Sequence, residues 1–168
     1  NPPNLLGIRL CEEFFPGVPQ VGVFDSAFNQ TLAPSAYLYG IPYRYYEKYR
    51  VRKYGFHGIT FHYMTSRAAE LLGRPLEELK IVSLMLGSGC TANACKGGKS
   101  VEVSTGLTPT EGLIQSTRCG DIDPLAVTYL MRKEGLTPQQ MDEILNRESG
   151  WLGISQVSND MREVEAAA

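Results

Sequence analysis

Two short segments each present one side chain that could handle an anion. In VFDSAF, Asp25 follows an alternating apolar run, where a carboxylate could position a metal ion or take a proton. The same aspartate could close an Asx turn or cap a helix, and the local sequence favours that structural role. In KYGFHG, Gly55 and Gly58 bracket His57, so a tight loop could bring the imidazole to a phosphoryl oxygen or to an acid–base step. A surface histidine in a structural turn fits this pattern equally well.

A third pair of segments adds backbone donors and a guanidinium. Gly87 and Gly89 in MLGSGC would let backbone N–H groups cradle a phosphate, although the spacing is not that of a Walker loop. Arg118 in STRCGDIDP could bind a phosphoryl or carboxylate group through two parallel hydrogen bonds. The alternative for this arginine is a salt bridge to Asp121 or Asp123. Taken together, the segments indicate an anion-binding cleft.

The overall composition narrows the class of protein. The 168 residues include 16 basic and 18 acidic side chains, a net charge of −2, which gives no electrostatic reason to expect nucleic acid or an anionic membrane as partner. No apolar run approaches the roughly 20 residues of a membrane span. Four cysteines without a redox or zinc spacing predict reduced thiols and no metal–thiolate site. We therefore expect a cytoplasmic protein with one domain or slightly more.

The elements that must position these groups follow from periodicity. A helix over residues 5–15 is expected after an Asn4 cap, followed by a strand over 18–26 with Val21, Val23 and Phe24 facing inward. Residues 35–38 and 42–49 predict short helical turns. Apolar spacing predicts a helix over 61–72 that ends at Gly73.

The second half of the sequence predicts a sheet followed by helices. Three runs separated by glycine turns, residues 80–86, 91–96 and 100–105, predict an antiparallel meander. Asp123 and Pro124 predict a helix to Glu134, and a capping box at Thr137 predicts another to about residue 147, closed at Gly150. Asp160 with Glu163 predicts a last capped helix. The expected class is α/β.

In the segments that carry Asp25, His57, the Gly87–Gly89 loop and Arg118, the sequence resembles the acetate kinase family of the sugar kinase–Hsp70–actin superfamily. The resemblance implies a partial ribonuclease H-like (actin-like ATPase) fold. Residues 1–28 would end the N-terminal domain of the family, and residues 29–168 would form most of the second, nucleotide-side domain, truncated at its C-terminus. Because the chain is well under half the usual family length, we expect a fragment. The matching stretches are VPQVGVFDSAF, YLYGIPYRYYEKY, KYGFHG, AAELLGRPLEELKI, the LGxG loop, GKSVEVSTGLTPTEGL, TRCGDIDP and SGWLGISQVSNDMR.

The same resemblance implies an activity and a set of site residues. The family transfers the γ-phosphoryl group of ATP to acetate with Mg²⁺, giving acetyl phosphate and ADP, and its members are homodimers. By this match, Asp25 would help place Mg²⁺ and the reacting groups, while His57 and Arg118 would stabilise the transferring phosphoryl group. Residues matching the nucleotide-binding segments are Met85, Leu86, Gly87, Ser88, Gly89, Asp160, Met161 and Arg162.

Three positions depart from the family pattern. Met85 stands where the family usually has histidine, Ser88 where it has asparagine, and Phe61 where it has a second histidine. Met85 cannot donate a hydrogen bond to phosphate, and His62 lies about 100° around the helix from position 61. Two interpretations follow. The chain is a catalytic segment, inactive in isolation, or a non-catalytic relative with a decayed nucleotide site that serves binding or assembly.

Overall fold

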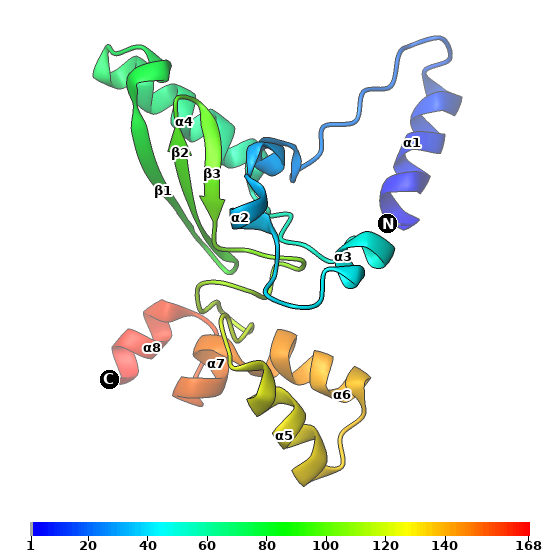
Figure 1. Cartoon of the computed structure of the whole chain (residues 1–168), viewed down its shortest axis with the longest axis vertical. Helices are drawn as coiled ribbons and strands as arrows, with labels where there is room; N and C mark the ends of the chain where they lie inside the picture. The colour runs from blue at the N-terminus through cyan, green and yellow to red at the C-terminus, as the bar shows by residue number, and fades with distance from the viewer. Residues whose placement is uncertain (1) are drawn as a thin grey trace.

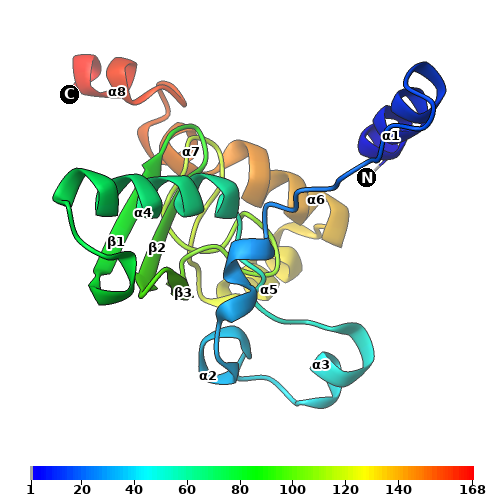
Figure 2. The same cartoon turned by 90° about the horizontal axis from the view of Figure 1, so that it is seen from above.

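The computed structural model describes residues 2–168 and is shown in Figures 1 and 2. A three-stranded sheet with one long helix occupies the middle of the chain, and a cluster of short helices follows it. The elements in order are α1 (Pro2–Phe14), η1 (Ala27–Thr31), α2 (Pro34–Tyr37), α3 (Arg44–Tyr49), α4 (Gly58–Leu72), η2 (Leu76–Glu78), β1 (Lys80–Leu86), β2 (Cys90–Lys96), β3 (Lys99–Val103), α5 (Pro124–Glu134), α6 (Pro138–Glu143), the π-helical η3 (Ile144–Glu148), α7 (Gly150–Ser155) and α8 (Met161–Ala167).

The sheet is the antiparallel meander that the sequence predicts, with strand order β1-β2-β3. In its register Ser83 pairs with Asn93 and Met85 with Thr91, so these side chains share one face. Helix α4 contacts β1, and η1 contacts β3, as the elements lie in Figure 2. The expected α/β class and the antiparallel meander are confirmed.

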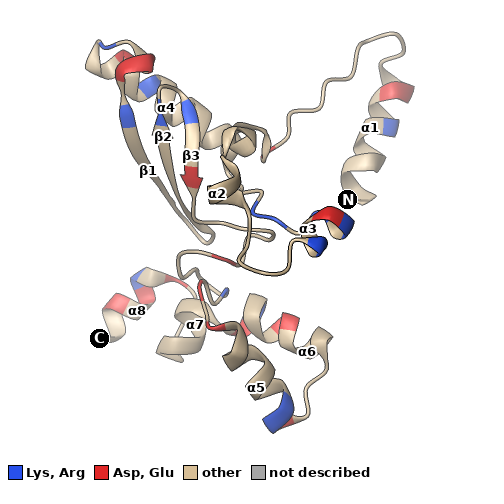
Figure 3. Ribbon diagram, in the orientation of Figure 1, with Lys and Arg blue, Asp and Glu red and all other residues tan. Residues whose placement is uncertain are grey.

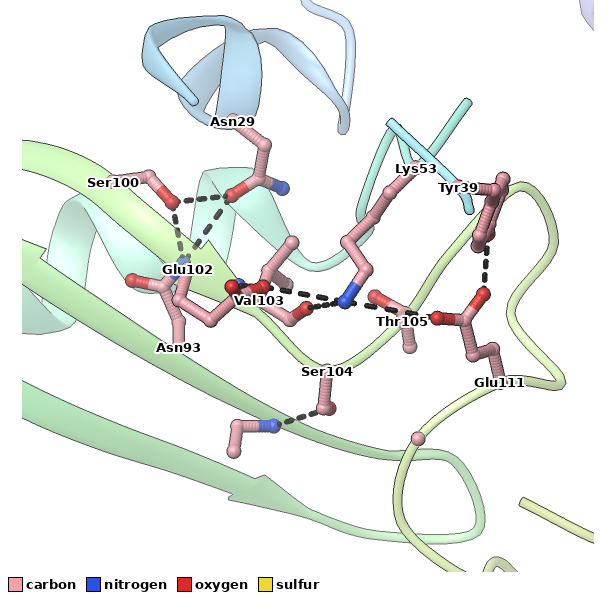
Figure 4. Close-up of polar contacts among 12 residues, drawn as sticks. Asn29, Tyr39, Lys53, Asn93, Ser100, Glu102, Val103, Ser104, Thr105 and Glu111 are labelled. Atoms are coloured by element: carbon pink, nitrogen blue, oxygen red, sulfur yellow. Dashed lines mark hydrogen bonds and ion pairs between the residues drawn. The ribbon is translucent and has the colours of Figure 1, made fainter. Parts of the chain in front are cut away.

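The interior between the sheet and η1 is unusually polar. Asn29, Asn93 and Ser100 are each at most 2% exposed. The Ser100 hydroxyl donates to Asn29 Oδ1 at 2.9 Å, and Asn93 Nδ2 donates to the Ser100 hydroxyl at 2.7 Å (Figure 4). Because a buried polar group without a partner is costly, this network fixes how η1 sits on the sheet. Apolar packing around it comes from Phe61 and Val103, both fully buried.

The N-terminal expectations are partly wrong. Helix α1 begins at Pro2, so Asn4 lies inside the helix instead of capping it. Residues 18–24 form no strand, and Val21, Val23 and Phe24 are all more than 70% exposed. An alternating run becomes a strand only when a neighbour satisfies its backbone, and none of the described residues pairs with this segment. Figure 1 accordingly shows an extended connection leading from α1 to η1.

The helices of the second half match more closely. Helix α5 has the expected bounds, with the Asp123 carboxylate accepting from Leu125 N–H. The Thr137 capping box is confirmed, but α6 ends at Glu143 and continues as a π-helical turn, and Gly150 opens α7 instead of closing a helix. Asp160 caps α8 as expected. Its own N–H donates to the Ser158 hydroxyl, so no donor remains there for Glu163 and the capping box is not completed.

Three general properties of residues 2–168 bear on the expected class of protein: the distribution of charge, the state of the cysteines and the apolar length of the helices. Basic and acidic residues are both distributed along the chain from α1 to α8 (Figure 3). All four cysteines are free thiols, and burial raises the pKa of Cys95 and of Cys119. In the part of the chain that the structure describes, no helix combines the length and apolar character needed to cross a bilayer.

Candidate active site

His57 occupies a strained backbone position immediately before α4. Its φ is +58°, in the left-handed region that residues with a side chain seldom adopt. Arg50 and Gln156 also have positive φ, but both are helix C-caps, where this conformation is common. His57 instead precedes a helix N-terminus. Strain of this kind persists only where surrounding contacts enforce it, and it is enriched at functional sites.

Asp25 supplies much of that enforcement. Its carboxylate Oδ2 accepts from the His57 N–H at 2.6 Å, and its carbonyl oxygen accepts from the Gly58 N–H at 2.8 Å. A longer contact of 3.5 Å joins Oδ1 to the Ile59 N–H. A negative group at a helix N-terminus satisfies donors that the helix itself leaves unpaired. The contacts of Asp25 are therefore those of a helix cap, the structural role that its local sequence favours, although the helix that it caps begins 33 residues later.

Backbone and side-chain bonds hold the loop that leads to His57. The N–H groups of Tyr54 and Gly55 both donate to the Gly106 carbonyl, and the Phe56 N–H donates to Thr105 Oγ1 at 2.9 Å. Together these contacts fasten the loop to the segment that follows β3.

A second set of contacts joins Lys53, at the start of this loop, to the end of β3 and to Glu111 (Figure 4). Lys53 Nζ donates to the Val103 carbonyl at 2.9 Å and lies 3.6 Å from the Glu111 carboxylate, which also accepts from the Tyr39 hydroxyl. Burial and the neighbouring Glu111 carboxylate raise the pKa of Tyr39 well above its ordinary value. Tyr39 therefore stays a neutral donor to Glu111 at neutral pH.

The glycine loop between β1 and β2 keeps two backbone donors available. Gly87 N–H donates to the Gly89 carbonyl at 3.1 Å, and the Ser88 carbonyl accepts from Ser116 N–H at 3.1 Å. Within residues 2–168 no acceptor meets the N–H groups of Ser88 and Gly89. Successive free N–H groups in a turn are the feature of an anion-binding nest.

Arg118 has no acidic partner among the described residues. Asp121 accepts from the Gly112 N–H and Asp123 caps α5, so the salt bridge considered for the arginine is not formed. Instead Nη1 donates to Gln115 Oε1 at 3.2 Å. Gln115 is 1% exposed, and its Oε1 also accepts from the Cys90 N–H. A half-buried guanidinium without a carboxylate is a ready site for an anion.

His57 and Arg118 converge on one point. A Cβ placed on Gly89 would lie 3.6 Å from Arg118 Nη1 and 3.7 Å from His57 Cε1. The two atoms can therefore be no further apart than the sum of these distances. An imidazole, a guanidinium and the free N–H of Gly89 thus surround a space that a side chain at position 89 would fill. This juxtaposition suits the oxygens of a phosphoryl group.

Beside this point lies a hollow of about 470 Å³. Its lining brings together two segments that the sequence analysis selected, Leu86–Ser88 and Asp160–Arg162, and adds Ser116 and Trp151. Asp160 and Arg162 pair with each other, and the hydrogen bonds from Arg162 lower the pKa of Asp160 to about 2. The segments are joined only in the folded chain.

Other selected residues lie elsewhere. Met85 is half-buried on the α4 side of the sheet, and it does not line the hollow, nor does Gly89. Phe61 is fully buried, with its ring edge-on to His57. His62 is exposed against Phe28, as its surface interpretation predicts.

Three residues at the site were missed by the sequence analysis. Thr91 and Gln115 bond to His57 and Arg118, and Trp151 lines the hollow. Neither Thr91 nor Gln115 carries a local sequence signal, because their importance depends on contacts across the fold. The single tryptophan of the chain was the one available clue.

The described residues fit a magnesium ion only in part. No group of three His, Cys, Asp or Glu side chains gathers in residues 2–168. Mg²⁺ is commonly held by one or two carboxylates together with substrate phosphates and waters. Asp25 can be one such carboxylate, since a carboxylate bound to two N–H groups retains lone pairs.

Comparisons with known proteins identify relatives of this chain. Acetate kinase from Dictyoglomus turgidum is 58% identical over 168 residues, and that from Caldanaerobacter subterraneus is 57% identical; each match covers the whole chain and 42% of the relative. The crystal structure of Porphyromonas gingivalis acetate kinase superposes with a TM-score of 0.96 at 46% identity, covering 99% of this chain and 42% of that one. A propionate kinase from Francisella tularensis gives a TM-score of 0.91 at 41% identity, with the same coverage.

The chain thus spans 42% of the length of these relatives. The family model described as the acetokinase family matches residues 1–168. On this match, and on its likeness to solved acetate and propionate kinases, the chain belongs to the acetokinase family.

Proposed function

We propose that this chain forms the phosphoryl-transfer part of an acetate kinase, which converts ATP and acetate, or a similarly short carboxylate, into ADP and acyl phosphate. The observation that carries the proposal is the meeting of His57 and Arg118 at Gly89. Their separation in the sequence excludes a local structural reason for the meeting. The relatives are named acetate and propionate kinases, so the length of the acyl chain stays open.

The role of each residue follows from its placement. When bound, Mg-ATP supplies the phosphoryl group, and the metal offsets charge on its oxygens. Arg118 can direct its fork at two phosphoryl oxygens, and His57 can donate from a ring nitrogen to a third. Both are held before substrate arrives, by Gln115 and by Thr91 and Asp25. Donors fixed in this way stabilise transition-state charge without reorganisation.

The hollow beside Gly87 is the proposed nucleotide site. Ser88 and Trp151 both line this hollow; the unpaired Ser88 N–H would bind a phosphate oxygen, and Trp151 offers an aromatic surface for the base. The ion-paired Asp160 and Arg162 also line it. We propose Mg²⁺ and ATP as cofactors, with Asp25 near the metal. We also propose that residues 1–28 belong to the first domain of the family and 29–168 to the second.

The proposal is tested in a chimeric enzyme, in which a relative of full length supplies the parts of an acetate kinase that lie outside these 168 residues. Residues 1–168 replace the matching stretch of the Dictyoglomus turgidum acetate kinase, and acetyl phosphate formation is measured. We expect turnover by the chimera and none above background by the 168-residue chain alone. His57→Ala and Arg118→Ala should each lower kcat by about 10²–10³-fold, the usual cost of one such donor.

Matched controls separate the site from general damage. His62→Ala and Arg67→Ala remove the same side-chain types from exposed positions, and both should leave kcat within twofold of the chimera. Normal turnover after His57→Ala and Arg118→Ala would remove the proposed roles.

The departures at Met85 and Ser88 favour one competing proposal, a relative that binds or assembles without catalysis. Calorimetry of the folded chimera with Mg-ATP distinguishes the two. Absence of heat, restored by Met85→His with Ser88→Asn, would favour a decayed site. We propose self-association as the partner interaction, which sedimentation at two concentrations would test.

A further inference from the structure

Thr91 is the direct neighbour of the His57 ring. Its hydroxyl oxygen lies 2.8 Å from His57 Nδ1, and its side chain is fully buried in β2. In the described part of the chain this is the one hydrogen bond of the Thr91 hydroxyl. No described residue hydrogen-bonds to Nε2 of the same ring.

The direction of this bond follows from counting donors. If Nδ1 carried the ring proton, it would donate to Thr91 Oγ1, and the buried hydroxyl proton would have no acceptor. If Nδ1 is bare, the hydroxyl donates to it and the buried hydroxyl proton is paired. Since an unpaired buried donor is costly, the second arrangement is favoured. It leaves the proton of the neutral ring on Nε2.

We propose that Thr91 is a positioning residue that holds neutral His57 with its proton on Nε2. Nδ1 is occupied by Thr91, so Nε2 is the ring nitrogen open to a ligand, and it is then a donor rather than an acceptor. For the proposed function, on which the significance of this assignment rests, a donor is what an anionic phosphoryl oxygen requires. A ring with its proton on Nδ1 would instead present the lone pair of Nε2 to the same anion, which is unfavourable.

Nitrogen-15 NMR of the imidazole rings tests the assignment directly. The chain has only two histidines, and His62→Gln identifies the remaining ring. Spectra are recorded without ATP or acetate over a range of pH, and the assignment is read from the neutral form of the ring, in which only one nitrogen carries a proton. We expect a bare Nδ1, a protonated Nε2, and a slowly exchanging Thr91 hydroxyl proton coupled to Nδ1.

Three variants complete the test. Thr91→Ser keeps the hydroxyl and should keep the native spectrum, whereas Thr91→Val keeps the shape, loses the coupling and admits the Nδ1–H form. Thr65→Val is the matched control, because Thr65 is equally buried but bonds to the Phe61 carbonyl. It should leave the His57 spectrum unchanged.

A protonated Nδ1 in the native chain would overturn the proposal, as would a Thr91→Val spectrum identical to the native one. If Thr91→Val fails to fold, the native and Thr91→Ser spectra still decide the matter. Because no substrate is present, this result is independent of whether the chimera forms acetyl phosphate.

Discussion

Gly89→Ala should separate the activity of this chain from its stability. The added methyl group would lie 3.4 Å from Gln115 Oε1, 3.6 Å from Arg118 Nη1 and 3.7 Å from His57 Cε1. All three are ordinary van der Waals distances, so the folded chain can accept the methyl group without moving its neighbours. The backbone at Gly89 does not have a positive φ. Alanine there should therefore raise the free energy of unfolding by about 0.4–1 kcal/mol, since it restricts the unfolded chain.

The effect on catalysis should be large and opposite. A phosphoryl oxygen held by both donors must lie about 2.7–3.1 Å from each. A methyl carbon 3.6 Å from Arg118 Nη1 and 3.7 Å from His57 Cε1, the ring carbon bonded to Nε2, occupies that space, and nonbonded carbon and oxygen need about 3.5 Å between them. The oxygen would have to leave at least one donor. We expect kcat of the chimera to fall by about 10²–10³-fold.

The assay pairs turnover of the chimera with urea unfolding of the same protein. Gly40→Ala is the matched control, because Gly40 has no atom within 4 Å of the added carbon and no positive φ. It should leave kcat within twofold of the native chimera and raise the free energy of unfolding by a similar amount, about 0.4–1 kcal/mol, so the two variants should differ only in turnover. Turnover by Gly89→Ala within twofold of the native chimera, in a protein of undiminished stability, would refute the placement of the phosphoryl group between His57 and Arg118.

Two further predictions concern stability. Gly55→Ala should lower the free energy of unfolding by about 2–4 kcal/mol in urea titration, because the φ of Gly55 is +74° and the new carbon would lie 2.5 Å from Val103 Cγ1. Gly135→Ala is the control, with φ +67° and nothing within 4 Å, and it should lower the free energy of unfolding by only about 1 kcal/mol. Equal losses in the two variants would contradict the argument that Gly55 is crowded by Val103. The N-terminus of α8 should loosen in acid: bonds from Arg162 lower the pKa of Asp160 from an ordinary 3.8 to about 2, so the stabilisation is complete above pH 3.8 and is lost as the pH falls toward 2. The protection factor of the Arg162 amide against hydrogen exchange measures this loosening. Asp160→Asn should abolish the pH dependence of that protection factor, and a native protection factor that stays constant across this pH window would exclude the prediction.

The elements that local chemistry specifies were predictable. The glycine turns of the meander, the Asp123–Pro124 start of α5 and the Thr137 capping box all act within a few residues. The strand expected at 18–26 failed because alternation describes a side-chain pattern, whereas a strand also needs a hydrogen-bonding neighbour, which none of the described residues provides.

The selected site residues show the same division. Residue type and setting predict a chemical role for Asp25, His57 and Arg118, and the acetate kinase resemblance links the three. Local patterns left a structural alternative open for each. For Asp25 the helix-capping contact is present, whereas for Arg118 the salt bridge is not, and no local rule distinguishes these outcomes.

By itself the sequence determined the α/β class, the three strands and the chemical types gathered near the glycine loop. Tertiary structure decided that His57 and Arg118 meet at Gly89, and that Thr91 and Gln115 hold them there. The physical reason is range. Turn and cap preferences act over a few residues, whereas these hydrogen bonds join side chains on separate elements and exist only once the sheet, α4 and the loop after β3 have packed.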